Sequence, residues 1–192
     1  MSISSITYSI IDFLIRSRLT RSAQVLFFIV IPILFGSLTP QLALRVIVLF
    51  LISYHINFYN DYCDRFEDSI DAKKRARNLF CSPEDSKQFA IAVVFLNALW
   101  IIGLGLTLLF DQSFFLYACA GYLFGVVYSH PKIRVRNRTY WDMIWHGMWP
   151  VVGGTPVILS ATAIPLSIRL ASVGLTFLAS VLAQMHQQLH DY

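Results

Sequence analysis

The sequence has few charged residues for its length. Only 14% of its 192 residues are charged, and 56% are hydrophobic. A soluble domain carries nearer to about 25% charge, because it needs a polar surface. The mean hydropathy is +0.60. This shortage of charge excludes an ordinary soluble domain, and we interpret the chain as a multi-pass integral membrane protein.

Metal-like and disulfide-like cysteine patterns are also missing. The three cysteines, Cys63, Cys81 and Cys119, share no spacing typical of either kind of site, so we interpret them as small apolar residues or incidental thiols. At the start of the chain, the arginines come after an apolar stretch rather than before it, and no small-residue cleavage site follows. We therefore expect no removable signal peptide.

Six apolar stretches approach or reach the length that crosses the hydrocarbon core of a bilayer, which is about 17–25 residues. They lie at about 23–38, 41–59, 89–110, 113–129, 142–162 and 165–187. Pro32 interrupts the first span, and Pro150 and Pro156 interrupt the fifth, which a membrane helix tolerates where neighbouring groups satisfy the freed carbonyls. We predict an all-α fold, a polytopic transmembrane bundle that forms a single domain over residues 1–192.

Basic residues are absent from three of the turns between these spans. The turns near residues 39–40, 111–112 and 163–165 contain none, whereas 13 of the 15 Lys and Arg residues precede span 1 or lie in the loops after spans 2 and 4. By the positive-inside tendency, the N-terminus and both long loops are cytoplasmic. In a prokaryote we expect the plasma (inner) membrane. The net charge of +4 then reflects topology, and we expect no nucleic-acid partner.

Span 2 runs into a group of acidic and amide side chains. At 100° per residue, Asn57, Asp61, Asp64 and Asp68 fall within an arc of about 60° on one helical face. Carboxylates at this spacing repel one another, and a membrane boundary screens them less than water does. Oxygen-only ligands favour Mg²⁺ over zinc or copper, and Mg²⁺ completes its shell with water and phosphate oxygens. The group therefore predicts a magnesium site with a phosphorylated ligand, active on the cytoplasmic face.

A basic segment follows span 4. Lys132, Arg134, Arg136 and Arg138 stand at every second position after Pro131. Cations at this spacing can clamp an anion whose oxygens face them. The alternative is plain positive-inside bias with contacts to lipid headgroups. For the acidic group the alternative is a solvated loop whose carboxylates balance the nearby cations.

The order of Asn60, Asp61, Asp64 and Asp68 gives the pattern NDxxDxxxD. In this the chain resembles the UbiA superfamily of intramembrane prenyltransferases, where the pattern is the first aspartate-rich motif. Residues 73–83 are also similar to the family's K-x-RP…G connection into the third helix, with Asn78 where proline is usual. The resemblance implies that the four residues of the pattern are metal ligands and that Asp64 and Asp68 are catalytic.

The segment after span 4 is similar to a second family element, Y-S-x-P-x-x-R-x-K. Tyr128 and Lys132 fit the family's YxxxK pattern, and Asp142 and Gly147 match the acidic and small residues that often begin the fifth helix. The resemblance implies that Tyr128 and Lys132 are catalytic. It also implies a set of residues that bind the diphosphate: Arg77, Ser129, Lys132, Arg134 and Arg136, with Arg16, Arg18 and Arg21 as unranked candidates.

The end of span 6 resembles the start of the family's second aspartate motif, DxxxD. Asp191 would supply its first carboxylate and a further metal ligand, and the second would fall at position 195, beyond the last residue. Family members usually have nine helices. We therefore expect six spans of a probable nine and a C-terminally incomplete chain, either a fragment or a natural truncation, or one completed by a partner.

The function that the resemblance implies is Mg²⁺-dependent transfer of a prenyl group. The donor is an allylic isoprenyl diphosphate, and the lipophilic acceptor, which the sequence does not identify, attacks within the membrane. The general base is also open among His55, His146, Asp68 and Asp142. Two alternatives are a truncated, non-catalytic paralogue or membrane subunit, which the missing helices favour, and a divalent-cation transporter with the carboxylates at its mouth.

Overall fold

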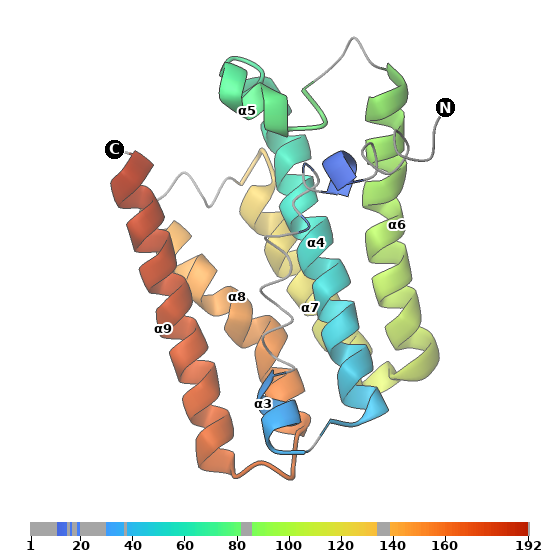
Figure 1. The fold of residues 1–192 in the computed structure, drawn as a ribbon, viewed down its shortest axis with the longest axis vertical. Coiled ribbons are helices and arrows are strands. Elements are labelled where there is room, and N and C mark those ends of the chain that lie inside the picture. Colours follow the sequence, from blue (N-terminus) through green and yellow to red (C-terminus); the bar gives the residue numbers. More distant parts are fainter. Residues whose placement is uncertain are drawn as a thin grey trace.

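The computed structural model describes residues 11–14, 16, 19, 30–36, 38–81, 86–133 and 139–191. These parts of the chain contain helices and no strands. Two helices are short, α3 (Val30–Leu34) and α5 (Ala72–Arg77). The other five are long and form a bundle (Figure 1): α4 (Pro40–Asp68), α6 (Ser86–Phe110), α7 (Gln112–Ser129), α8 (Thr139–Ser160) and α9 (Leu166–Asp191).

The five long helices coincide with predicted spans 2 to 6. Helix α4 continues beyond residue 59, where the predicted membrane span ends, to Asp68. The acidic group therefore belongs to the helix itself. In span 1, the described part forms α3, and a turn with Gly36 at φ +60° follows it. The rest of that span lies outside the described residues. Helix α8 runs unbroken through Pro150 and Pro156, so the predicted interruption was wrong: each proline removes one backbone hydrogen bond, and packing against α9 supports the helix.

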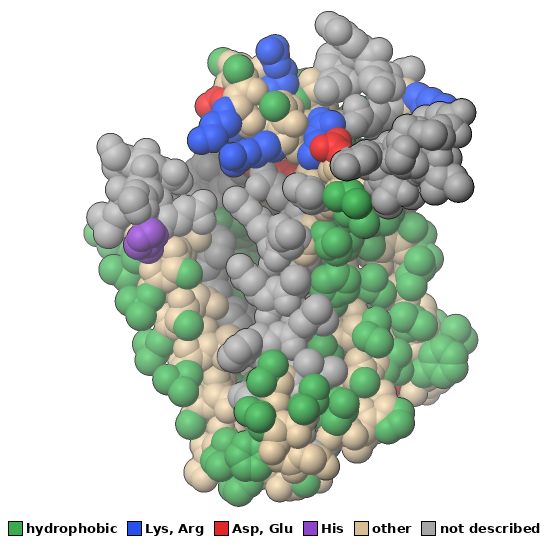
Figure 2. Space-filling view, in the orientation of Figure 1, with side chains coloured by type: hydrophobic (Ala, Val, Ile, Leu, Met, Phe, Trp, Pro, Cys, Tyr) green, Lys and Arg blue, Asp and Glu red, His purple; other side chains and the backbone are tan. Residues whose placement is uncertain are grey.

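Three helices in the described part of the chain are long and apolar enough to cross a membrane: Pro40–Asp68, Phe89–Phe110 and Leu166–His186. The last of these leaves large side chains such as Leu175 and Leu182 exposed, which suits contact with lipid. Figure 2 shows a largely hydrophobic surface below one end where Lys and Arg side chains gather. The protein is an all-α, membrane-embedded bundle, as the sequence predicts.

Helix α4 lies at the centre of the packing. Leu49 and Ile52 of α4 belong to one apolar cluster with Phe114 of α7 and Ile158 of α8. A second, smaller cluster surrounds Phe58, further along α4, and includes residues from α6 and from the loop after α5. We call the end of the bundle at which α4 finishes at Asp68 and α7 at Ser129 the cluster end.

The opposite end of the bundle contains a paired charge. Arg45 donates through Nε to Oδ2 of Asp111 at 2.6 Å and through Nη2 to Oδ1 at 3.2 Å. Asp111 also caps α7, since its carboxylate accepts from the backbone N–H of Phe114. A bidentate pair neutralises the cation where the turns hold no Lys or Arg. The pair therefore joins the start of α4 to the α6–α7 turn.

Candidate functional site

Three carboxylates of α4 are buried at the cluster end. The exposed fraction is 1% for Asp61, 7% for Asp64 and 9% for Asp68. A carboxylate is strongly solvated in water, so burial of three on one helix is costly unless hydrogen bonds or a cation compensate for it. This placement differs from the solvated loop that was the alternative interpretation of the acidic group.

Asn60 connects the carboxylates to the end of α7. Its Nδ2 donates to Oδ2 of Asp64 at 3.1 Å, and its Oδ1 accepts from the hydroxyl of Ser129 at 3.0 Å. The close approach of the two helices is possible because Gly125, one turn before Ser129, faces Ile56 of α4 without a side chain of its own. The structure thus brings together Asn60, Asp64 and Ser129, which the sequence assigned to two separate motifs.

Asn78 contacts the other end of the acidic group, and the sequence motifs predicted no site role for it. Its Nδ2 donates to Oδ2 of Asp68 at 2.9 Å and to the backbone carbonyl of Asp61 at 2.8 Å. Its Oδ1 accepts from the N–H of Phe80 at 2.9 Å. One feature of the sequence could have pointed to this contact: Asn78 stands at a position where the family pattern has proline.

The hydroxyl of Tyr128 lies in a second polar network, at the junction of three helices. Tyr128, on α7, donates to Oδ1 of Asp142 at 2.5 Å, and Nε2 of Gln184, on α9, donates to Oδ2 of the same carboxylate at 2.6 Å. Asp142 is 3% exposed. The single proton of the phenol points to Asp142, so Tyr128 presents lone pairs, rather than a donor, to any further partner.

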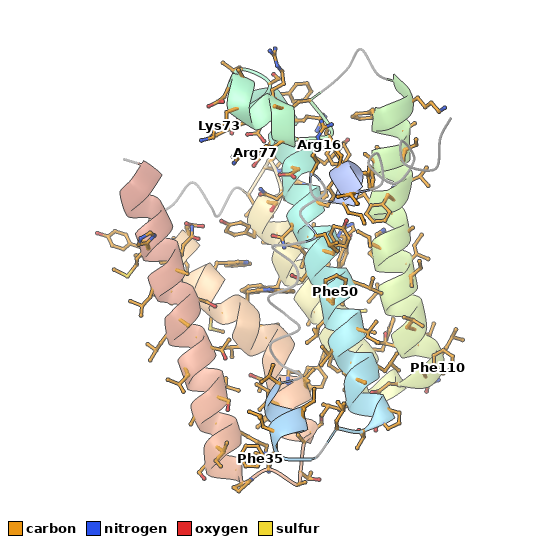
Figure 3. The ribbon with its side chains drawn as sticks, viewed as in Figure 1. Arg16, Phe35, Phe50, Lys73, Arg77 and Phe110 are labelled. Atoms are coloured by element: carbon orange, nitrogen blue, oxygen red, sulfur yellow. The ribbon has the colours of Figure 1, made fainter. Side chains whose placement is uncertain are left out.

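In the described part of the chain, the Lys and Arg residues predicted to bind the diphosphate do not surround the carboxylates of α4. Lys132 is exposed in the turn after α7, where its N–H donates to Nδ1 of His130. Arg77 is exposed at the end of α5, and Figure 3 shows Arg16, Lys73 and Arg77 at the cluster end. The positions of Arg134 and Arg136, and the side chain of Asp191, lie outside the described residues.

The electrostatic effect of the acidic group is evident at Cys81. Burial, reinforced by the carboxylates of Asp68 and Asp61, raises the pKa of this thiol to about 11. Its Sγ donates to the backbone carbonyl of Arg65 at 3.1 Å. All three cysteines of the chain are free thiols. Burial is the main cause of this shift, and the carboxylates of α4 add to it.

Comparison with known protein families matches residues 17–192 to the UbiA prenyltransferase family. The chain belongs to this family. The resemblance inferred from the sequence motifs is thereby confirmed, and UbiA membership carries the general activity of prenyl transfer within a membrane. Neither the curated proteins nor the solved structures gave a match.

UbiA proteins generally use divalent metal ions, and the acidic group of α4 is where this member could hold one. Within the described residues, no three His, Cys, Asp or Glu side chains come close enough together to hold a metal ion by themselves. Mg²⁺ does not require such a cage, because it binds one or two carboxylates and fills its shell with water and phosphate oxygens. The oxygen donors of Asn60, Asp61, Asp64 and Asp68 fit that chemistry.

The four residues that the sequence left open as a general base lie in different surroundings in this UbiA protein. His55 is buried against the rings of Tyr59 and Tyr122, on the side of α4 opposite to Asp64 at 100° per residue. The side chain of His146 lies outside the described residues, and Asp68 accepts from Asn78. Asp142 is a buried carboxylate at the cluster end with a hydroxyl already bonded to it.

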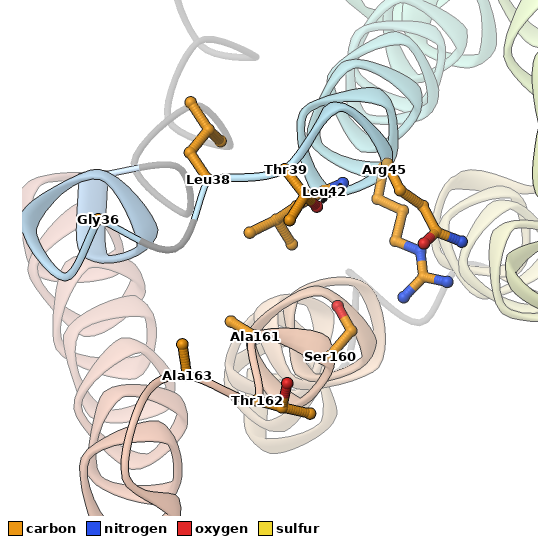
Figure 4. Close-up of a pocket in the computed structure, with 10 residues that line it drawn as sticks. Gly36, Leu38, Thr39, Leu42, Arg45, Ser160, Ala161, Thr162 and Ala163 are labelled. Atoms are coloured by element: carbon orange, nitrogen blue, oxygen red, sulfur yellow. Dashed lines mark hydrogen bonds between the residues drawn. The ribbon is translucent and has the colours of Figure 1, made fainter.

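A pocket at the other end of the bundle is separate from this site. It lies between the α3–α4 turn, the start of α4 and the end of α8 (Figure 4), with Arg45 and Thr162 among its polar residues. The guanidinium of Arg45 is already engaged by Asp111. The described residues that line the pocket therefore include no carboxylate and no unpaired cation that would hold a metal-bound diphosphate.

Proposed function

We propose that this UbiA protein binds an allylic isoprenyl diphosphate with Mg²⁺ at the cluster end and transfers the prenyl group to a lipophilic acceptor in the membrane. The observation that carries the proposal is the burial of Asp61, Asp64 and Asp68 at 9% exposure or less. Buried carboxylates on one helix are costly unless hydrogen bonds or positive charge compensate for them. Mg²⁺ would add positive charge beside them, and the diphosphate oxygens would complete its shell.

The proposed ligands of Mg²⁺ are Asn60, Asp61, Asp64 and Asp68, joined by Asp191. When bound, the metal neutralises charge on the diphosphate leaving group. Asn60 orients the carboxylate of Asp64 through its 3.1 Å bond and fixes the distance to Ser129 through its 3.0 Å bond. This bridge holds the end of α7, where the basic segment begins, against the acidic group.

The basic segment is the proposed partner of the diphosphate oxygens. Lys132, Arg134 and Arg136, with Arg77 and the Ser129 hydroxyl, bind the phosphates and stabilise charge as the C–O bond breaks. Tyr128 is a proposed catalytic residue, and its hydroxyl donates a hydrogen bond to Asp142. We place this end, and the N-terminus, on the cytoplasmic side because the Lys and Arg residues gather there.

The apolar interior provides the environment for the transfer step. Rings of α4, α6 and the loop after α5 pack around Phe58, where Phe95 lies edge to face and Phe80 lies tilted against it. Such walls keep water away from an allylic cation until the acceptor attacks. We propose that residues 1–192 form one transmembrane domain. The prenyl chain would lie along the spans, on the membrane side of the acidic group.

The test uses the purified full chain in lipid nanodiscs with radiolabelled geranylgeranyl diphosphate and Mg²⁺. We expect Mg²⁺-dependent binding and consumption of the diphosphate in the presence of a suitable acceptor. Asp64→Ala should reduce both by about 100-fold, the usual loss when a group that stabilises developing charge is removed. Glu67→Gln is the matched control, because it neutralises an exposed carboxylate on the same helix and should leave both values unchanged.

Membrane insertion and monodispersity of each variant are checked by size-exclusion chromatography. A wild-type protein that neither binds nor consumes any allylic diphosphate would remove the proposal. Equal losses in the Asp64→Ala and Glu67→Gln variants would show that general surface charge, rather than a metal site on α4, accounts for binding.

A further inference from the structure

Asn78 is a fully buried amide whose hydrogen-bonding capacity is largely used. It is 0% exposed and directly follows α5. The two hydrogens of Nδ2 go to the Asp61 carbonyl at 2.8 Å and to Oδ2 of Asp68 at 2.9 Å, while Oδ1 accepts the N–H of Phe80 at 2.9 Å. Both partners of Nδ2 are acceptors only, so the flipped amide would place oxygen against oxygen, and the orientation of the side chain is unambiguous.

The loop that carries Asn78 has other anchors. Leu79 is 0% and Phe80 3% exposed, and both pack into the apolar cluster around Phe58. The thiol of Cys81 donates to the backbone carbonyl of Arg65 at 3.1 Å. Apolar burial and the Cys81 bond both hold this loop on α4 independently of Asn78. The bond from Asn78 to a carboxylate therefore has a purpose beyond docking.

We infer that Asn78 is a positioning residue that holds one oxygen of Asp68 so that the other faces a metal-bound diphosphate. Asn78 bonds to Oδ2 of Asp68, and among the described residues no hydrogen bond to Oδ1 is seen. A carboxylate fixed in this way is already oriented before the metal binds. Binding then loses less conformational entropy, which favours metal affinity. Proline, the usual residue in the family pattern, has no side-chain N–H and cannot make this bond.

The inference rests on the proposed function and adds a residue to it. Groups that hold a metal ligand in place typically change metal affinity by about 10-fold to 100-fold when they are removed. We therefore expect Asn78→Ala to raise the Mg²⁺ concentration that half-saturates binding by about 10-fold or more. Asn78→Ser keeps one hydroxyl donor and should give an intermediate value.

The experiment measures binding of inorganic diphosphate to the purified full chain by isothermal titration calorimetry over a range of Mg²⁺ concentrations. Thermal stability without Mg²⁺ is measured in parallel. Cys81→Ala is the matched control, since it removes the other polar anchor of the same loop without touching a carboxylate. It should leave the half-saturating Mg²⁺ concentration within about twofold of wild type, whatever it does to stability.

A double-mutant cycle identifies Asp68 as the group through which Asn78 acts. In an Asp68→Asn background, Asn78→Ala should have little further effect on the half-saturating Mg²⁺ concentration, because the two residues form one unit. Equal shifts in Asn78→Ala and Cys81→Ala, or full additivity with Asp68→Asn, would overturn the inference while leaving the proposed function standing. A wild-type chain that binds no diphosphate with Mg²⁺ would overturn both.

Discussion

The close contact between α7 and α4 makes a quantitative prediction at Gly125. A Cβ built on Gly125 lies 2.2 Å from Cδ1, 2.4 Å from Cγ1 and 2.8 Å from Cγ2 of Ile56, all below the 3.0 Å that real Cβ atoms respect. Gly125→Ala therefore forces the side chain of Ile56, or the helix, to move. Overpacking of this kind costs about 1–3 kcal/mol. Close backbone approach at small residues is also how membrane helices commonly associate.

Gly121 provides the matched comparison on the same helix. A Cβ there meets only Cζ3 of Trp149 at 3.7 Å, an ordinary van der Waals contact. Both changes replace a buried helical glycine with alanine, so the gain in helix propensity, about 1 kcal/mol, cancels between them. The free energy of unfolding of the Gly125→Ala variant should be lower than that of Gly121→Ala by about 1–3 kcal/mol.

The assay is reversible unfolding of the purified chain by sodium dodecyl sulfate in mixed micelles, followed by circular dichroism. Truncating Ile56 to alanine in the Gly125→Ala background should restore a large part of the loss, because it removes the atoms with which the new methyl group collides. Equal stabilities of the Gly121→Ala and Gly125→Ala proteins would refute the packing described for α4 and α7.

Two further predictions concern titrating groups outside the spans. The guanidinium of Arg45 holds the pKa of Asp111 at about 2, below its ordinary 3.8. This pair therefore stabilises the fold above pH 3.8 and ceases to do so as the pH falls from 3.8 to about 2. Asp111→Asn should lower stability at neutral pH by about 2 kcal/mol and reduce its acid dependence in thermal unfolding; an unchanged pH profile would contradict the pair. Burial and nearby carboxylates raise the pKa of Cys81 to about 11, so its alkylation, followed by mass spectrometry, should stay slow near neutral pH and accelerate toward that value, whereas a rate equal to that of the denatured chain would contradict its burial.

The helices and the acidic group could be predicted because both depend on local sequence. Apolar length identified α4, α6, α7, α8 and α9, and helical periodicity placed Asp61, Asp64 and Asp68 on one face. The span predicted from hydropathy ended at residue 59, and the helix continues to Asp68, as the helical spacing of the acidic group required. The polar residues of this last part form helix as readily as the apolar ones before them.

The hydrogen-bond networks could not be predicted, because they depend on how distant segments pack. Asn78 meets Asp68 across a turn and a short helix, and Gln184 meets Asp142 across 42 positions of the chain. Neither spacing has a local signature. The phenol of Tyr128 illustrates the consequence: the resemblance indicated a catalytic residue, and the structure adds a carboxylate, Asp142, that accepts its hydrogen bond.

The most direct test of the magnesium site is the affinity for geranylgeranyl diphosphate, measured by equilibrium dialysis with Mg²⁺ and with a chelator. For the wild-type chain, Mg²⁺ should tighten binding by about 10-fold or more, since it places positive charge between the buried carboxylates and the phosphates. For Asp64→Asn, the two affinities should be nearly equal. A wild-type chain that binds the diphosphate equally well with and without Mg²⁺ would contradict the account.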